Sequence, residues 1–198
     1  MSLLSDHKFV ILGGGGHACV IADLIQSIGS QVAGFVTPNV PQGQLVYQDL
    51  PSLGSDAEFA AAYAPENTLL ALGVGDKGLR QSLYQQYSKQ GFGFPSLVHP
   101  SAWLSPTVQI GEGTQVMAGS IVQARSVLGI AVIVNTQASV DHDAMVGDFT
   151  HIAPGAVLCG SVQVGTGVHI GAGATVIQEI SLSADTFIKA GICVKRSQ

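Results

Sequence analysis

Residues 132–170 read VIVNTQASVDHDAMVGDFTHIAPGAVLCGSVQVGTGVHI, and within them a Val, Leu or Ile returns at every sixth position. The same spacing continues in both directions without an insertion. The seventeen positions of the series are Val98, Leu104, Ile110, Val116, Val122, Leu128, Val134, Val140, Val146, Ile152, Leu158, Val164, Ile170, Val176, Leu182, Ile188 and Val194. Most positions four residues further on are small or branched, from Ala102 to Ala156. A fixed period of this kind predicts a repeat fold before any local propensity is considered.

Aliphatic side chains at this spacing can share one interior if each six-residue unit forms one short face of a coil. Three faces then close a triangular turn of eighteen residues, and successive turns stack about 4.8 Å apart through parallel backbone hydrogen bonds. Glycines follow the aliphatic position in several units and relieve crowding where the chain turns. They are Gly111, Gly129, Gly147, Gly165 and Gly171. The period therefore predicts a parallel β-helix, and by itself it does not give the handedness.

The residues before this repeat follow a different pattern, in which apolar runs alternate with helical periodicity. Strands are predicted at 8–12, 31–36 and 68–73, and helices at 17–28, 55–63 and 79–89, with a loop at 37–54. This alternation predicts a small doubly wound α/β unit. We expect a first domain at residues 1–96, with a disordered lead at 1–7, and a second domain at 97–198.

A run of glycines, GGGGHA at residues 13–18, lies between the first predicted strand and helix and fits the pattern G-x-G-x-x-A. Such glycines let backbone N–H groups at a helix start approach a phosphate closely. A nicotinamide ribose would need a carboxylate near the end of the second strand, where the chain reads Phe35-Val36-Thr37. A redox dinucleotide is therefore disfavoured, and another phosphate-bearing ligand or a purely structural turn remains. His17 is expected to contact a diphosphate or to cap the helix.

The composition excludes several classes of function. The net charge of −5 disfavours a nucleic-acid partner. No apolar run is long enough to span a membrane, and no signal peptide is recognisable. Three scattered cysteines without a CxxC pair are typical of a reducing cytoplasm. Charged residues make up only 11% of the chain, against about 25% in ordinary soluble domains. This scarcity is expected of a surface that is partly covered by sister subunits.

The densest polar cluster of the second half is Asp141-His142-Asp143. Because the interior of the coil is aliphatic, these side chains must lie outside it. A carboxylate beside an imidazole fixes its tautomer and raises its basicity, which suits a general base. The simpler alternative is a solvated turn. None of the three cysteines is close to His142 in the sequence.

His151 and His169 are separated by one eighteen-residue coil, so they are expected to stack about 5 Å apart. His142 precedes His151 by half a coil and should lie on another face. A sister subunit packed along the prism would bring His142 of one chain near His151 of another. A composite site at a subunit interface, for a metal or for acyl transfer, is therefore expected.

Three stretches carry a resemblance to a known family: GGGGHA (13–18), LVHPSAWLSP (97–106) and NTQASVDHDAMVGDFTHIAPGA (135–156). With them the chain resembles the bacterial UDP-amino-sugar N-acetyltransferases of the bacillosamine type and the related sialic-acid O-acetyltransferases. The resemblance covers nearly the whole chain. It implies a Rossmann-like subdomain, a left-handed β-helix and a homotrimer that uses acetyl-CoA.

The resemblance also implies roles for individual residues. His142 would be the catalytic base, and Asp143 matches its partner carboxylate, which is usually Glu in the family. The remaining positions would bind the two substrates: Gly13, Gly15, His17, Gly73 and Asn135 for the nucleotide sugar, and His151, Gly160 and Ala172 for acetyl-CoA between neighbouring subunits. Neither a metal nor a covalent enzyme intermediate is expected.

Two departures from the family stand out. The acidic run after the second strand, GFLDD-like in the family and in contact with the nucleotide, is here Gly34-Phe35-Val36-Thr37-Pro38. The chain also stops short of the family's C-terminal segment, so Lys195 and Arg196 either meet the phosphates of CoA or form a solvated tail.

The leading hypothesis is transfer of an acetyl group from acetyl-CoA to the amine of a UDP-linked 4-amino-deoxy sugar, for surface glycan biosynthesis. The alternatives are O-acetylation of a sialic acid or another sugar hydroxyl, a metal-dependent hydratase similar to the γ-carbonic anhydrases, and a non-catalytic binding β-helix. The hydratase is disfavoured because no two histidines here are five residues apart, as two of its ligands are.

Overall fold

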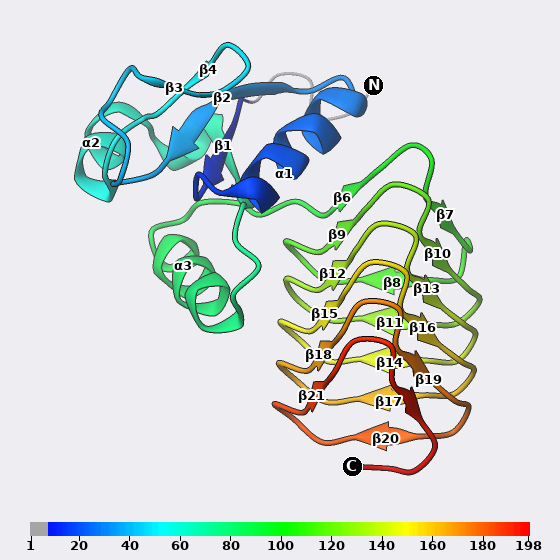
Figure 1. Ribbon diagram of the computed structural model, residues 1–198. Coiled ribbons are helices and arrows are strands. Elements are labelled where there is room, and N and C mark those ends of the chain that lie inside the picture. The colour runs from blue at the N-terminus through cyan, green and yellow to red at the C-terminus, as the bar shows by residue number, and fades with distance from the viewer. Residues whose placement is uncertain (1–7) are drawn as a thin grey trace. The chain divides into compact units, whose positions relative to one another are not determined.

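The computed structural model describes residues 8–198, so the disordered lead expected at residues 1–7 lies outside the described residues. The chain divides into two compact units, one ending at Pro95 and the other beginning at Ser96 (Figure 1). Each unit has its own core and is described separately.

The first unit is built on a three-stranded parallel sheet with the order β2-β1-β5. Its strands are β1 (Lys8–Leu12), β2 (Gln31–Val36) and β5 (Thr68–Leu72), and its helices are α1 (Gly16–Ser27), α2 (Asp56–Ala62), η1 (Pro65–Asn67) and α3 (Lys77–Lys89). From Phe9 to Leu12 strand β1 is buried, as a central parallel strand with two covered faces must be. The three predicted strands and three predicted helices are all present.

The loop predicted at residues 37–54 is the main local error. It contains a short antiparallel pair, β3 (Leu45–Tyr47) and β4 (Leu50–Pro51). Strands of three and two residues are too short to show an alternation, so their pattern could not be recognised. Helix α3 also begins two residues earlier than predicted, because Asp76 caps it by accepting a hydrogen bond from the Leu79 N–H at 2.8 Å.

The second unit is a parallel β-helix whose two-residue strands form three sheets. The first sheet contains β6 (Leu97–Val98), β9 (Gln115–Val116), β12 (Ile133–Val134), β15 (His151–Ile152), β18 (His169–Ile170) and β21 (Phe187–Ile188). The second contains β7 (Trp103–Leu104), β10 (Ile121–Val122), β13 (Ser139–Val140), β16 (Val157–Leu158), β19 (Thr175–Val176) and β22 (Cys193–Val194). The third contains β8 (Gln109–Ile110), β11 (Val127–Leu128), β14 (Met145–Val146), β17 (Gln163–Val164) and β20 (Ser181–Leu182). Figure 1 shows these strands stacked in successive coils.

The aliphatic residue of each unit points into the coil. Val122, Val140 and Leu158 are fully buried and stack in register along the second sheet. Some of the small residues four positions further on carry a buried hydroxyl, which donates a hydrogen bond to the backbone. Thr114 Oγ1 donates to the Gly129 carbonyl and Ser126 Oγ to the Asp141 carbonyl, both at 2.7 Å. The predicted fold class, an α/β region followed by a left-handed parallel β-helix, is confirmed.

The corners of the β-helix are crowded, as expected from their glycines. A Cβ at Gly111 would lie 2.6 Å from the carbonyl carbon of Gly129 in the next coil. Another position at the corners adopts the left-handed backbone conformation. At the corner between the second and third sheets, the residues in this position are Arg125, Asp143, Ser161 and Glu179, with φ between 59° and 62°. Residues at one corner thus form a column in which side chains eighteen positions apart meet.

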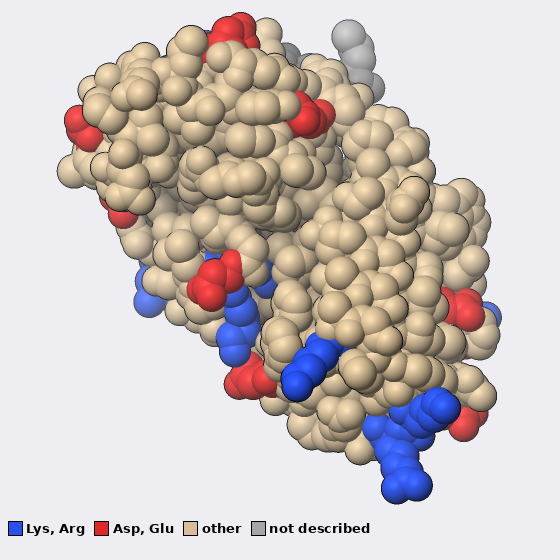
Figure 2. Space-filling view, in the orientation of Figure 1, with Lys and Arg blue, Asp and Glu red and all other residues tan. Residues whose placement is uncertain are grey.

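Acidic and basic side chains are few on the face shown in Figure 2, and most of that surface is uncharged. Several large apolar side chains of the β-helix are also exposed: Trp103, Ile121, Met145, Phe187 and Ile192. Such a surface is suited to contact with other chains.

Candidate active site

His142 lies at the corner that joins β13 to β14. Its side chain is 55% exposed, and its Nδ1 is 2.7 Å from Oδ2 of Asp143. Because an ionised carboxylate only accepts hydrogen bonds, Nδ1 carries the proton in the neutral ring and Nε2 keeps a lone pair. Although Asp is one methylene shorter than Glu, it reaches the ring. Asp141 instead accepts from the backbone N–H of His142 at 2.8 Å, so only one of the two flanking carboxylates touches the imidazole.

Asp143 also binds a cation that was not among the expected site residues. Arg125 lies one coil earlier at the same corner, and its Nε and Nη2 donate to Oδ1 and Oδ2 of Asp143 at 2.6 and 2.8 Å. The hydrogen bonds from Arg125 and then from His142 lower the pKa of the Asp143 carboxyl to about 2. The carboxylate therefore stays ionised beside the imidazole throughout the neutral range. The offset of eighteen residues was the signal that could have identified Arg125.

Gly160 lies directly against the ring of His142 from the next coil. A Cβ at this position would be 2.7 Å from Cε1 and 2.8 Å from Nε2 of the imidazole. The family resemblance implies a role for Gly160 in binding acetyl-CoA. In the structure, only a residue without a side chain leaves the ring in this position.

The imidazole opens into a cavity of about 400 Å³ at this corner. Its lining residues are Asp141, His142, Cys159, Gly160, Ser161, Gln178 and Glu179. Cys159, remote from His142 in the sequence, therefore lies beside the same cavity. Its free, partly buried thiol is accessible to a ligand that enters there.

Asn135 and His151 meet on another face of the β-helix. The side-chain nitrogen Nδ2 of Asn135 is 3.0 Å from Nε2 of His151. The rings of His151 and His169 are 5.0 Å apart, as the eighteen-residue spacing predicted, and His169 stacks in turn on Phe187. This column of three rings follows the outer side of β15, β18 and β21.

Within one chain the predicted site residues fall into separate groups. His142, Asp143 and Gly160 belong to the corner after β13 and β16. Asn135, directly after β12, and His151, the first residue of β15, belong to the first sheet. Ala172 is exposed at the corner after β18, where its carbonyl accepts from the Gly191 N–H. One β-helix therefore does not gather the complete set around a single point.

The glycine loop of the first unit follows β1 at the carboxyl edge of the parallel sheet. The Gly13 N–H donates to the Val36 carbonyl, and a Cβ at Gly13 would lie 3.0 Å from the carbonyl oxygen of Gly73. The space next to Gly15 is open, and His17 lies in the first turn of α1. The loop thus brings Gly13 and Gly73 together and leaves the start of α1 accessible, which is the geometry of an anion site.

A cavity of about 330 Å³ lies beside this loop. It is lined by Leu12, Gly13, Gly14, Val36, Thr37, Pro38, Asn39, Asp56, Val74, Leu79 and Leu83. The carboxylate that is missing after the second strand is supplied here by Asp56, the first residue of α2. Its Oδ1 accepts a 2.7 Å hydrogen bond from the Tyr87 hydroxyl, and burial followed by this hydrogen bond raises the pKa of Tyr87.

Asp56 is far from the glycine loop along the chain, so its place in this cavity could not be recognised from the sequence.

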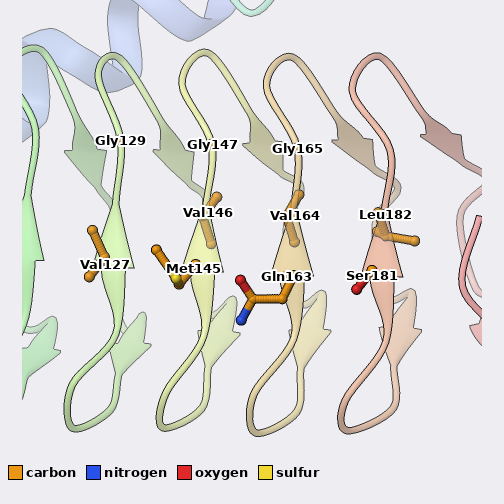
Figure 3. Close-up of a pocket in the computed structure, with 10 residues that line it drawn as sticks. All are labelled: Val127, Gly129, Met145, Val146, Gly147, Gln163, Val164, Gly165, Ser181 and Leu182. Carbon is orange, nitrogen blue, oxygen red and sulfur yellow. The ribbon is translucent and has the colours of Figure 1, made fainter.

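A third cavity, of about 420 Å³, lies on the outer side of the sheet that contains β11, β14, β17 and β20. Figure 3 shows Val127, Met145 and Gln163 on successive strands of this sheet. None of its ten lining residues is titratable. This face can bind an apolar group or another chain, but it has no group for proton transfer.

Within residues 8–198 no group of three His, Cys, Asp or Glu side chains is arranged to hold a metal ion. No helix in that range is both long and apolar enough to cross a membrane.

The chain is similar to several known proteins. Residues 8–87 match the family model of the PglD N-terminal domain, and residues 143–178 match that of the bacterial transferase hexapeptide repeats. The acetyltransferase domain of PglB from Neisseria gonorrhoeae FA1090 is 34% identical, with a TM-score of 0.91 over 96% of this chain and 92% of that chain. That domain has also been solved in complex with acetyl coenzyme A.

A mutant of perosamine N-acetyltransferase from Caulobacter crescentus, in complex with CoA and GDP-perosamine, is 35% identical, with a TM-score of 0.89 over 99% of this chain and 92% of that chain. Among curated proteins, the bifunctional protein GlmU of Streptomyces avermitilis is 38% identical over 78 residues. The matched segment spans only 16% of the length of GlmU.

Proposed function

Because the chain belongs to the family of hexapeptide-repeat sugar N-acetyltransferases, we propose that it transfers the acetyl group of acetyl-CoA to the amine of a nucleotide-linked amino sugar. The observation that carries the proposal is the contact between His142 and Asp143, which leaves Nε2 free to accept a proton. The sugar N-acetyltransferase from Caulobacter, bound to CoA and a nucleotide-linked amino sugar, supports the class of both substrates.

The reaction proceeds by direct attack. The sugar amine attacks the thioester carbonyl carbon while Nε2 of His142 takes the amine proton, and backbone N–H groups stabilise the tetrahedral oxyanion. The C–S bond then breaks and the CoA thiolate takes the proton from the imidazolium. Asp143 holds the ring in the productive tautomer and stabilises its protonated form.

We assign the nucleotide to the first unit. The start of α1, with Gly15 and His17, is suited to the diphosphate, and the adjoining 330 Å³ cavity to the nucleoside. A UDP-linked 4-amino-deoxy sugar is one candidate acceptor. A GDP-linked sugar is a second, favoured by Asp56 in that cavity, because a carboxylate can accept from the N–H groups of the guanine edge.

The catalytic site is assigned to the interface between subunits of a homotrimer. In one chain, His142 and the pair Asn135–His151 lie on different parts of the prism, so a neighbouring β-helix is needed to bring the two groups together. Acetyl-CoA would run between the two chains past His151, Gly160 and Ala172. Lys195 and Arg196 are both exposed at the end of the β-helix and are open to its phosphates.

We place the reaction in the cytoplasm, since Cys19, Cys159 and Cys193 are all free thiols.

The test is thiol release from acetyl-CoA with a panel of UDP- and GDP-linked amino sugars, and with free sialic acid as the O-acetylation arm. Turnover that depends on a nucleotide-linked amine and is lost in His142→Ala supports the proposal. Full acetyl transfer by His142→Ala would remove His142 from the mechanism. Turnover only with sialic acid would show that the acceptor is a sugar hydroxyl and not a nucleotide-linked amine.

A further inference from the structure

Arg125 is the one cation that touches the His142–Asp143 pair among the contacts described above. It lies eighteen residues before Asp143, so the two residues occupy the same corner position in consecutive coils, and both have the left-handed backbone conformation. This backbone directs the two side chains along the corner column toward each other. The guanidinium meets both oxygens of the carboxylate, with Nε to Oδ1 and Nη2 to Oδ2.

This fork fixes the orientation of the carboxylate. A lone Asp side chain can turn about its last torsion, whereas two parallel hydrogen bonds from a planar guanidinium hold the carboxylate in one plane. Oδ2 is the atom that also accepts from Nδ1 of His142. Arg125 therefore determines where the partner of the imidazole points, although it does not contact the ring itself.

The guanidinium also changes the charge that the imidazole experiences. An isolated carboxylate next to a histidine favours the protonated ring, and a positive charge on the other side of that carboxylate opposes the effect. A general base has to be unprotonated when the amine arrives. The guanidinium therefore offsets part of the negative charge that the carboxylate places beside the ring.

Stability does not explain this ion pair. The side chains of Arg125 and Asp143 are 67% and 35% exposed, and exposed ion pairs contribute little to the free energy of folding. The other charged or titratable groups at this corner are Asp141, which binds the backbone of His142, and Cys159 and Glu179, which line the cavity. None of these three supplies a positive charge.

We propose that Arg125 is a positioning residue for the acetyl-transfer reaction, which acts through Asp143 to orient the His142 imidazole. The effect of Arg125 on the reaction rate rests on the proposed function. Its effect on the ring itself can be measured without any substrate.

The kinetic test compares Arg125→Gln, Arg125→Lys and Asp143→Asn, with kcat and the KM for acetyl-CoA measured separately. Arg125→Gln should lower kcat several-fold and leave the KM for acetyl-CoA unchanged, because the imidazole is misoriented while the cofactor still binds. Asp143→Asn should lower kcat at least as much, because it changes the partner of the ring itself. Arg125→Lys should restore only part of kcat, because Lys returns the charge without the fork.

The matched control is Lys89→Gln, which removes one positive charge from an exposed position in the last turn of α3 and should leave both kcat and KM unchanged. If Arg125→Gln lowered kcat and weakened acetyl-CoA binding in parallel, Arg125 would have a merely structural role and the proposal would be overturned. The same conclusion would follow if Arg125→Lys behaved like Arg125→Gln.

NMR of the His142 ring in the same variants, at one fixed pH, separates this inference from the proposed function. The Nδ1 resonance reports the hydrogen bond to Asp143 and should shift in Arg125→Gln even if no acetyl acceptor has been found. A shifted resonance without turnover of any sugar would contradict the proposed function and keep the positioning role of Arg125. An unshifted resonance in an active enzyme would contradict the role of Arg125 alone.

Discussion

Replacement of Gly160 by alanine tests the geometry of the site most directly. The new methyl group would lie 2.7 Å from Cε1 of His142, and ordinary contacts begin at 3.4 Å, so the ring has to move by 3.4 minus 2.7, about 0.7 Å. The three nearest heavy atoms to this Cβ all belong to that one ring, and the φ of Gly160 is outside the left-handed region. The backbone therefore accepts alanine, and the exposed imidazole moves.

The expected effect is on catalysis. Because misplacement of a reacting group by about 1 Å can cost a factor of 10² in rate, we expect kcat to fall about 50-fold, or about 2.3 kcal/mol in the barrier. The melting temperature should change by no more than about 2 °C, as for other surface substitutions. The assay is thiol release with the best acceptor of the panel, accompanied by thermal unfolding of the same preparation.

Two controls make the result decisive. Gly75→Ala also adds a methyl group to a glycine without a left-handed φ, at a position with no atom within 4 Å, and should have wild-type kinetics. In a His142→Ala background, Gly160→Ala should cause no further loss, because the ring it displaces is gone. If Gly160→Ala raised only the KM for acetyl-CoA and left kcat unchanged, Gly160 would be a cofactor contact alone and our reasoning about the ring would be wrong.

Co-expression of His142→Ala with Asn135→Ala chains should restore about a quarter of wild-type activity if each site takes one residue from each of two neighbouring chains. Activity no higher than that of the separate variants would show that the site lies within one chain. Asp56→Asn, which keeps an acceptor for the Tyr87 hydroxyl, should raise the KM for a guanine nucleotide sugar about tenfold with little change in kcat; an unchanged KM would exclude Asp56 from base recognition. The pKa of Asp143 is lowered to about 2 in the folded protein. Because the side chain is exposed, its contribution to stability is small; it is complete above the unfolded pKa of about 3.9 and is lost as the pH falls toward 2. In urea unfolding, the difference in the free energy of unfolding between wild type and Asp143→Asn should therefore be constant from pH 7 to about 5 and shrink below about pH 4. A difference that already shrinks at neutral pH would mean that the carboxyl of Asp143 is not held ionised as the structure indicates.

The β-helix could be predicted almost completely from the chain. Val122, Val140 and Leu158 share an interior because their spacing matches the coil, and each coil bonds only to its neighbours. The same period placed His151 and His169 in one column at the observed 5.0 Å. The strand pair β3–β4 was missed because such short segments carry no period.

The position of His142 outside the coil and its neighbour Asp143 also followed from the sequence, since an aliphatic interior leaves no room for them. What the sequence did not show is the surrounding arrangement: Arg125 on the carboxylate and Gly160 under the ring. Both lie eighteen residues from the residue they contact, so the period brings the backbones together. Whether the side chains meet depends on corner conformation and rotamers, which no spacing specifies.

Asp56 marks the limit of sequence reasoning in the first unit. No carboxylate stands directly after the second strand. Instead, Asp56 at the start of α2 lines the cavity, and its side chain accepts a hydrogen bond from Tyr87 of α3. Repeats can be predicted because each coil bonds mainly to its neighbours, at an offset that the sequence itself displays. The contacts of an α/β unit join segments at unrelated separations, so only the tertiary structure could decide which side chains line its cavity.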